Sequence, residues 1–189
     1  KGFICCILSP CPPCGLESEY FKRHETRRRQ FYVVLEQIVK VVTGLLIRWK
    51  CPGCNKTFTQ YPDFALPYKR YTLPTIMDFC GRYTENENAT YRKVTVKTTL
   101  GYRNSEKQLE HSTIHRWITS LGSLKTTVAK SVDLILQANP LSSICRNIAK
   151  LSIGSKKYRS FARKEMLITC RRLFQIEALY LKTFNISIF

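Results

Sequence analysis

Two Cys-x-x-Cys pairs are the most chemically informative residues of this sequence. The first is Cys11-Pro-Pro-Cys14 and the second is Cys51-Pro-Gly-Cys54. Each pair can place two thiolates on one metal ion, and together they make the four-sulfur tetrahedral site that is usual for structural Zn²⁺. Gly15 and Asn55 follow the pairs, and both residue types tolerate the left-handed backbone of a tight metal-binding turn. We therefore predict one structural zinc ion, bound by Cys11, Cys14, Cys51 and Cys54.

Other uses of these cysteines fit the sequence less well. A thioredoxin-like redox pair needs a βαβ context, which the sequence does not show. The total of nine cysteines is odd, which argues against a fully disulfide-paired framework. The remaining cysteines lack partner spacing, and most of them are expected to be buried free thiols: Cys5, Cys6, Cys80, Cys145 and Cys170. For Cys5 and Cys6, near Cys11, a role as alternative metal ligands is the other possibility. Because a four-cysteine site has no open coordination position, we expect the zinc to stabilise the fold and not to catalyse.

The charge of the chain indicates the kind of partner it binds. There are 31 Lys and Arg residues against 13 Asp and Glu, which gives a net charge of +18. A polyanion is the simplest partner for such a chain, and nucleic acid is the leading candidate. Five cations gather in one short polar run: Lys22, Arg23, Arg27, Arg28 and Arg29. We predict that this cluster contacts phosphate groups, with a merely solvated face as the alternative.

A membrane is a weaker candidate partner. No run approaches the roughly 18 apolar residues that a membrane-spanning helix needs. The apolar stretch Phe3–Leu8 is too short for the core of a signal peptide. We therefore expect no membrane partner and a cytoplasmic protein.

The cysteine pairs need a scaffold, and residues 1–68 are predicted to supply it as a zinc ribbon of antiparallel strands. The long segment between the pairs, residues 15–50, is expected to be an elaborated hairpin. We predict a β-branched strand over residues 33–42, for which an amphipathic helix over 34–42 is the alternative. A turn at Thr43-Gly44 should follow.

Strands over residues 45–50 and 56–59 should then flank the second cysteine pair. Trp49 and Phe58 are expected to cover the metal, because small ribbons depend on the metal and a few aromatic side chains for stability. The Pro-punctuated segment 61–71 should be an extended connector, since residues before proline avoid the helical region.

Beyond residue 71 the sequence is predicted to be mainly helical. The best-defined helix is His111–Gly122, with Ser112 as its N-cap and Gly122 at its end. Its apolar residues recur at helical spacing and should be buried: Ile114, Trp117, Ile118 and Leu121. One further helix is predicted to start at Thr72, and others to cover residues 90–97, 126–137, 141–151 and 156–183. A strand is the alternative around 94–96. Residues 100–110 are predicted to form a loop.

The opposite face of the 111–122 helix carries short hydrogen-bonding side chains and one guanidinium: Thr113, His115, Arg116, Thr119 and Ser120. Such residues on the second helix of a helix-turn-helix contact base edges and phosphates. We predict that this helix enters the major groove of DNA. Arg116 is the best candidate for contact with guanine or phosphate.

Three segments occur in a characteristic order: Cys51–Thr59, Phe64–Tyr71 and Ser112–Ile118. Together they resemble the zinc-ribbon and helix-turn-helix proteins of bacterial mobile elements, related to the N-terminal DNA-binding regions of insertion-sequence transposases. The resemblance covers about residues 9–122. It implies zinc on the two cysteine pairs and DNA contact by the helix that contains residues 113–120.

The predicted fold class is α+β. A small antiparallel zinc ribbon over residues 1–68 should precede a helix-turn-helix-like DNA-binding region over 69–123 and a C-terminal helical region over 124–189. The residues predicted to contact DNA are Ser112, Thr113, His115, Arg116 and Thr119 on the helix, Lys22, Arg23, Arg27, Arg28 and Arg29 in the basic cluster, and Lys69 and Arg70.

The predicted function is zinc-dependent, sequence-specific binding of double-stranded DNA. The protein would be a non-catalytic component or regulator of a transposon or recombination system, with any recombinase on a separate chain. The acidic residues are scattered, and no Ser-His-Asp or Cys-His pattern stands out, which argues against an enzyme. The alternatives are an RNA-binding or ribonucleoprotein-associated zinc module and a protein–protein adaptor in a recombination or transcription complex.

Overall fold

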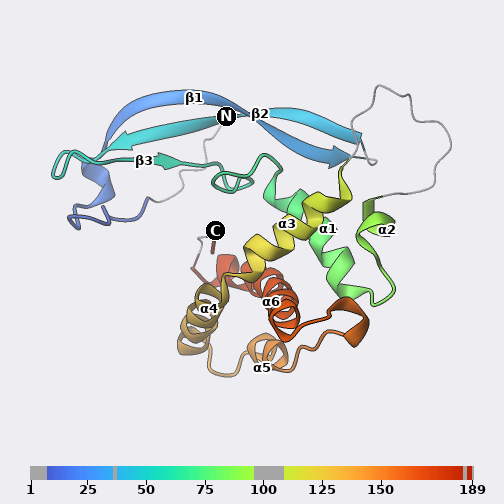
Figure 1. Cartoon of the computed structure of the whole chain (residues 1–189). Helices are drawn as coiled ribbons and strands as arrows, with labels where there is room; N and C mark the ends of the chain where they lie inside the picture. Colours follow the sequence, from blue (N-terminus) through green and yellow to red (C-terminus); the bar gives the residue numbers. More distant parts are fainter. Residues whose placement is uncertain (1–7, 36–37, 96–108, 185–186, 189) are drawn as a thin grey trace. The chain divides into compact units, whose positions relative to one another are not determined.

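A computed structural model describes residues 8–35, 38–95, 109–184 and 187–188 (Figure 1). The fold class is α+β, as predicted, because a small antiparallel sheet of three strands precedes a mainly helical region. The strands are β1 (Lys22–Leu35), β2 (Ile38–Lys50) and β3 (Thr57–Gln60). The helices are α1 (Leu73–Glu85), α2 (Tyr91–Thr95), α3 (His111–Gly122), α4 (Lys125–Ala138), α5 (Ser143–Ala149) and α6 (Phe161–Phe184).

Contacts between residues divide the chain into two compact units. The sheet unit comprises residues 1–33 and 41–72, and the helical unit comprises residues 34–40 and 73–189. Three predictions fall on residues outside the described ranges: Cys5 and Cys6 as alternative ligands, the end of the 90–97 helix, and most of the 100–110 loop.

β1 and β2 are neighbours in the sheet and form the long hairpin predicted between the cysteine pairs. The predicted turn at Thr43-Gly44 is wrong, and so is the alternative helix, because β2 runs from Ile38 to Lys50. Gly44 instead makes room for aromatic rings. A Cβ atom at this position would lie 2.8 Å from Cε2 of Phe31 and 3.2 Å from Cζ of Phe64. The glycine therefore serves packing and not chain reversal.

The pairing of β2 with β3 defines two faces of the sheet. Trp49 lies opposite Phe58, and Arg48 lies opposite Thr59 in this antiparallel ladder. Successive side chains of a strand point to opposite faces. Trp49 and Phe58 therefore share one face, while Arg48 and Thr59 share the other. The strands predicted on either side of the second cysteine pair are confirmed.

The connector between β3 and α1, residues 61–71, is predicted from sequence to be extended. The structure shows that it is extended only in part. It reverses direction at residues 62–65 and 66–69, where backbone N–H···O=C bonds of 2.8 and 3.2 Å close two turns. It then runs beside β1. The N–H of Tyr32 donates to the carbonyl of Arg70 (2.7 Å), and the N–H of Thr72 donates to the carbonyl of Tyr32 (2.9 Å).

The helical predictions hold for the order of the elements and for most of their buried faces. α1 buries its apolar stripe, Ile76, Phe79, Cys80 and Tyr83. Residues 91–95 form α2, so the helix and not the strand alternative is correct there. The bounds of α4, α5 and α6 are close to those of the three helices predicted in the C-terminal region, 126–137, 141–151 and 156–183.

α3 has the predicted bounds and buries the predicted residues Ile114, Trp117, Ile118 and Leu121. Its N-cap is Glu110 and not Ser112, because the first helical residue is His111. Gly122 is the last residue of α3 and packs against α6. A Cβ atom there would lie 2.5 Å from the carbonyl oxygen of Met166. The absence of a side chain thus permits close packing of α3 on α6.

Among the helices in the described part of the chain, none combines the length and apolar character needed to span a bilayer.

Candidate metal centre and nucleic-acid interface

The two cysteine pairs fold into matching turns. The N–H of Gly15 donates to the carbonyl of Cys11 (2.7 Å), and the N–H of Asn55 donates to the carbonyl of Cys51 (2.9 Å). A second bond joins the N–H of each first cysteine to the carbonyl five residues later (2.8 and 2.9 Å). Gly15 has a φ of 70° and Asn55 a φ of 59°, which confirms the predicted left-handed conformation.

The turns bring four sulfur atoms together. The Sγ atoms of Cys11, Cys14, Cys51 and Cys54 all lie within 4.8 Å of one another. The Cys11–Cys54 and Cys14–Cys51 sulfurs are each 3.5 Å apart, far beyond the roughly 2.05 Å of a disulfide. Thiolates at about 2.3 Å from a tetrahedral zinc ion would lie about 3.8 Å apart. The four cysteines can therefore hold a metal ion with little rearrangement.

The clustered thiols differ in their acidity. Burial, reinforced by the contact with Cys54, raises the pKa of Cys11 to about 12. Burial acts in the same direction at Cys51, but backbone hydrogen bonds from Cys54 and Gly53 and contacts with the other thiols outweigh it and lower the pKa of Cys51 to about 7. Like charges this close cannot all form unless a positive ion shares them. A divalent metal ion satisfies that condition.

Aromatic side chains surround the sulfur cluster, as predicted for Trp49 and Phe58. Both pack against the buried group formed by Cys11, Phe21 and Cys51. The rings of Phe21 and Phe58 meet edge-on with centroids 4.7 Å apart. Nε1 of Trp49 donates to Oε1 of Gln60 (2.9 Å). This core is small, so a bound metal would contribute much of the stability of the sheet unit.

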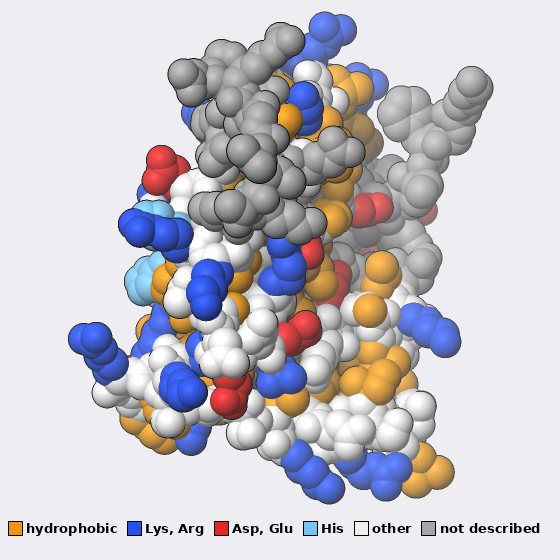
Figure 2. All heavy atoms as spheres, turned by 90° about the vertical axis from the view of Figure 1, so that its right-hand side faces the viewer, with side chains coloured by type: hydrophobic (Ala, Val, Ile, Leu, Met, Phe, Trp, Pro, Cys, Tyr) orange, Lys and Arg blue, Asp and Glu red, His pale blue; other side chains and the backbone are white. Residues whose placement is uncertain are grey.

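β1 carries the predicted phosphate-binding cluster. Four of its cations are exposed: Lys22, Arg23, Arg27 and Arg28. The fifth, Arg29, is half-buried. Arg23 donates from Nε to the Thr26 hydroxyl (2.9 Å), and Arg27 pairs with Glu25 (2.6 Å). Glu25 is the one acidic residue of β1, so the strand keeps a strong positive charge. Lys and Arg side chains also predominate over Asp and Glu on the face shown in Figure 2.

Lys69 and Arg70, also predicted to contact DNA, lie beside β1 within the sheet unit. The carbonyl of Lys69 accepts from the guanidinium of Arg29 (3.3 Å). The exposed Arg70 donates to the hydroxyl of Tyr32 (3.4 Å). The structure thus brings these cations close to the basic strand, although they are about 40 residues away in sequence.

The predicted reading face of α3 is only partly open. His115 meets the ring of Tyr91 of α2 edge-on at 5.7 Å, and the hydroxyl of Thr119 accepts from Arg163 of α6 (3.1 Å). Burial and then the charge of Arg163 lower the pKa of His115, so its imidazole is neutral at pH 7.

Three residues of that face are nevertheless exposed: Ser112, His115 and Arg116. Arg116 donates to the Ser112 hydroxyl at 3.4 Å. Thr113 is half-buried. The N-terminal half of α3 therefore offers the better surface for a partner.

One protein family matches the chain over residues 11–117, described as the domain of unknown function DUF6431. The match covers more than half of the 189 residues. The chain belongs to the DUF6431 family. Comparisons with curated proteins and with solved structures gave no match.

The DUF6431 match begins at Cys11 and ends at Trp117. It therefore contains all four clustered cysteines, the three strands, α1, α2 and the exposed N-terminal half of α3. The last three helices lie outside it. The sulfur cluster and the basic strand are thus parts of the DUF6431 domain itself.

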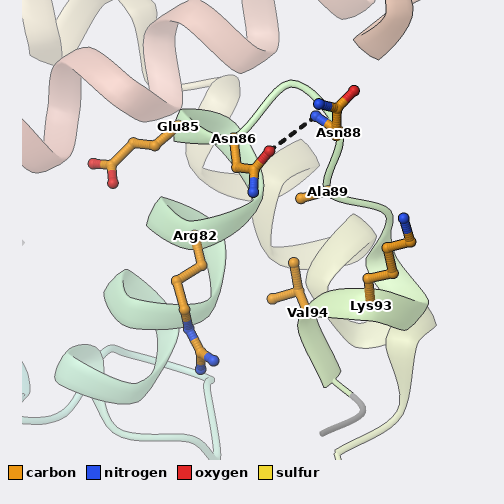
Figure 3. A pocket seen from close by; sticks show the side chains of 7 residues that line it. All are labelled: Arg82, Glu85, Asn86, Asn88, Ala89, Lys93 and Val94. Atoms are coloured by element: carbon orange, nitrogen blue, oxygen red, sulfur yellow. Dashed lines mark hydrogen bonds between the residues drawn. The ribbon is translucent and has the colours of Figure 1, made fainter.

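An open pocket of about 550 Å³ lies at the C-terminal end of α1 (Figure 3). Its lining consists of Arg82, Glu85, Asn86, Asn88, Ala89, Lys93 and Val94. The side-chain oxygen of Asn86 accepts the N–H of Asn88 (2.9 Å), which stabilises the turn after the helix. Among the described residues that line this pocket, Glu85 is the one carboxylate.

The other described cysteines are buried free thiols, as predicted for Cys80, Cys145 and Cys170. Cys80 of α1 and Cys170 of α6 are in contact. Burial and then this contact raise the pKa of Cys80. The Cys80 thiol therefore stays protonated, and both side chains contribute to packing.

Arg48 and Tyr61 were not among the predicted site residues, yet both lie near the basic strand. Arg29 donates to the hydroxyl of Tyr61 (3.4 Å), and Arg29 and Arg48 line one groove. The sequence indicates part of this arrangement, because Leu46 and Arg48 are two residues apart and therefore lie on the same face of a strand. The pairing that places this face beside β1 is a tertiary property.

Proposed function

We propose that this protein is a zinc-stabilised, non-catalytic DNA-binding protein. The observation that supports this most strongly is the exposed cationic strand β1, which lies in the same unit as the sulfur cluster. Four thiolates in this geometry are the usual ligand set of structural zinc. The metal would hold the two cysteine turns together, and the sheet would present β1 to the phosphate backbone.

Backbone contact and base contact would come from different elements. The cations of β1 bind phosphates and supply affinity without sequence information. The exposed Arg116 and Ser112 of α3 are the candidates for base contact, because an arginine can donate two hydrogen bonds to guanine in the major groove.

The resemblance to the DNA-binding regions of insertion-sequence transposases supports a role in transposition or recombination. In that role the protein would act at the bacterial nucleoid as a partner or regulator of a separate recombinase. RNA binding and an adaptor role are the competing functions, and binding measurements with duplex DNA and structured RNA distinguish them.

The proposal predicts that the zinc-loaded protein binds duplex DNA with a strong salt dependence, since each cation on a phosphate releases a counterion. The triple variant Lys22→Ala, Arg23→Ala and Arg28→Ala should bind roughly one to two orders of magnitude more weakly. Its plot of log Kd against log salt should become less steep by about one for each phosphate that the variant no longer binds. Fluorescence anisotropy with a labelled duplex at several salt concentrations measures both quantities.

A second triple variant provides the control. Lys130, Lys150 and Lys156 are exposed lysines of the helical unit, and their replacement by alanine removes the same charge. This control should bind duplex DNA more tightly than the β1 variant. Equal losses in both variants, or a wild-type protein that binds structured RNA and not duplex DNA, would refute the proposed role of β1. Binding to neither nucleic acid would favour the adaptor.

A further inference from the structure

A groove of about 740 Å³ lies on the face of the sheet that carries Arg48 and Thr59. This volume is within the range of sites that bind small organic ligands, about 300–1,000 Å³. The residues that define its chemistry are Arg27, Arg29, Arg48, Tyr61, Pro67 and Tyr68. All of them belong to the sheet unit. Guanidinium groups and tyrosine rings therefore converge on one concave surface.

Two of the guanidinium groups are held in place by neighbours. Arg48 donates from Nε and from a terminal nitrogen to the Thr57 hydroxyl (3.2 and 2.9 Å). Arg29 lies over two rings, 5.4 Å from the centroid of Phe31 and 5.8 Å from that of Tyr61. A guanidinium that is already positioned loses less freedom when it binds an anion. Both arginines are thus suited to phosphate.

Positive charge continues beyond the groove along β1. Arg23, Arg27 and Arg29 have the spacing of one strand face. Arg27 forms an ion pair with Glu25. The described residues that line the groove include no acidic side chain. A row of cations matches a row of phosphates better than a single phosphate. The ligand suggested by the charge is a strand of nucleic acid.

Tyr68 has features that folding alone does not require. Its surface is 91% exposed, so its ring adds little to packing. Its φ is 61°, in the left-handed region that is costly for residues with a Cβ. It occupies the third position of the turn over 66–69, where glycine or asparagine is favoured when φ is positive. A strained residue with an exposed ring is typical of a functional site.

We propose that this groove binds an unpaired nucleotide of a nucleic-acid strand. The arginines would bind its phosphates, and the ring of Tyr68 would stack on its base, with Tyr61 beside it. Bases in a duplex are stacked on each other and their faces are hidden, so an exposed tyrosine ring favours single-stranded nucleic acid. This inference rests on the proposed function and extends it, because it assigns to the sheet a contact that duplex DNA alone would not use.

The test compares a labelled strand of ten thymidines with a duplex of equal length, in fluorescence anisotropy with zinc-loaded protein. Tyr68→Gly should bind the single strand at least about tenfold more weakly, because the variant has no ring to stack on a base. Its melting temperature should be unchanged or higher, since glycine accepts a positive φ. Tyr68→Phe keeps the ring and should bind like the wild type.

Charge is tested in the same assay with the double variant Arg27→Ala and Arg48→Ala. It should weaken single-strand binding by tenfold or more, whereas Lys130→Ala with Lys150→Ala removes equal charge elsewhere and should have a smaller effect. Strands of DNA and RNA distinguish the two sources of an unpaired nucleotide. Free thymidine monophosphate should not displace the labelled strand when both are at the same concentration. If it does, the groove binds a single nucleotide, and the assignment to a strand is wrong.

The outcomes separate this inference from the proposed function. If duplex binding depends on the β1 lysine and arginines but Tyr68→Gly binds the single strand like the wild type, the inference is wrong and the proposed function stands. A Tyr68→Gly protein that melts earlier would show that the ring is structural, which also overturns the inference. Binding to no form of nucleic acid would overturn both.

Discussion

Removal of the metal is expected to unfold the sheet unit and to leave the helical unit folded. Among residues 8–35 and 38–72, the buried cluster around the sulfurs consists of Cys11, Phe21 and Cys51, with a few partly buried neighbours. An apparent binding free energy of about 10–16 kcal/mol is typical of structural zinc at pH 7, and in small metal domains it is also the free energy of folding. The helical unit has its own core, which includes the fully buried Ile114, Leu167 and Leu173.

Amide hydrogen exchange before and after a strong chelator measures this effect in the full chain. Protection of the amides in β2 and β3 should fall to that of an unfolded chain and return when zinc is added, while amides of α3 and α6 should stay protected. Cys51→Ser should behave like the chelated protein. Cys145→Ser, which changes a buried thiol of α5, should keep the strands protected. A chelated protein whose β2 and β3 amides exchange as slowly as before would show that the metal is not structural.

Acid is expected to release the metal and to destabilise the sheet unit. Zinc binds thiolates, so the bound cysteines have pKa values far below the ordinary value of about 8.5 in an unfolded chain. Groups whose pKa is depressed in the folded state stabilise it above their unfolded pKa and lose this effect as the pH falls. Because burial raises the pKa of Cys11 to about 12, proton competition at this thiol is strong.

The apparent zinc affinity should therefore fall by several orders of magnitude between about pH 8 and pH 6, since up to four protons compete with one metal ion. Competition with a chromogenic chelator at each pH gives the affinity, and calorimetry in two buffers of different ionisation enthalpy gives the number of protons released. An affinity that does not change over this interval would mean that thiolates are not the ligands.

Local chemistry made the metal turns predictable from sequence. Gly15 and Asn55 each follow a cysteine pair, at the position where the turn needs a left-handed backbone. Each turn closes with backbone hydrogen bonds between residues at most five apart. The helix His111–Gly122 was also predictable, because four apolar residues at helical spacing determine its buried face. In both cases the information lies within a few consecutive residues.

The errors arose where the role of a residue depends on a distant contact. Gly44 has the sequence signature of a turn, but its position is determined by the rings of Phe31 and Phe64, which only the folded sheet brings together. His115 and Thr119 lie on the polar face of a helix, and only the packing of α2 and α6 shows that this face is partly covered. The groove at Arg48 needs the register of β2 and β3, which short-range patterns do not fix.

We propose above all that four cysteine thiolates bind one zinc ion in the sheet unit. Zinc X-ray absorption spectroscopy on the purified full chain, combined with metal analysis, tests it most directly. We expect one zinc ion per chain with four sulfur ligands at about 2.3 Å. A chain that binds no zinc, or zinc whose first shell contains nitrogen or oxygen in place of sulfur, would contradict it.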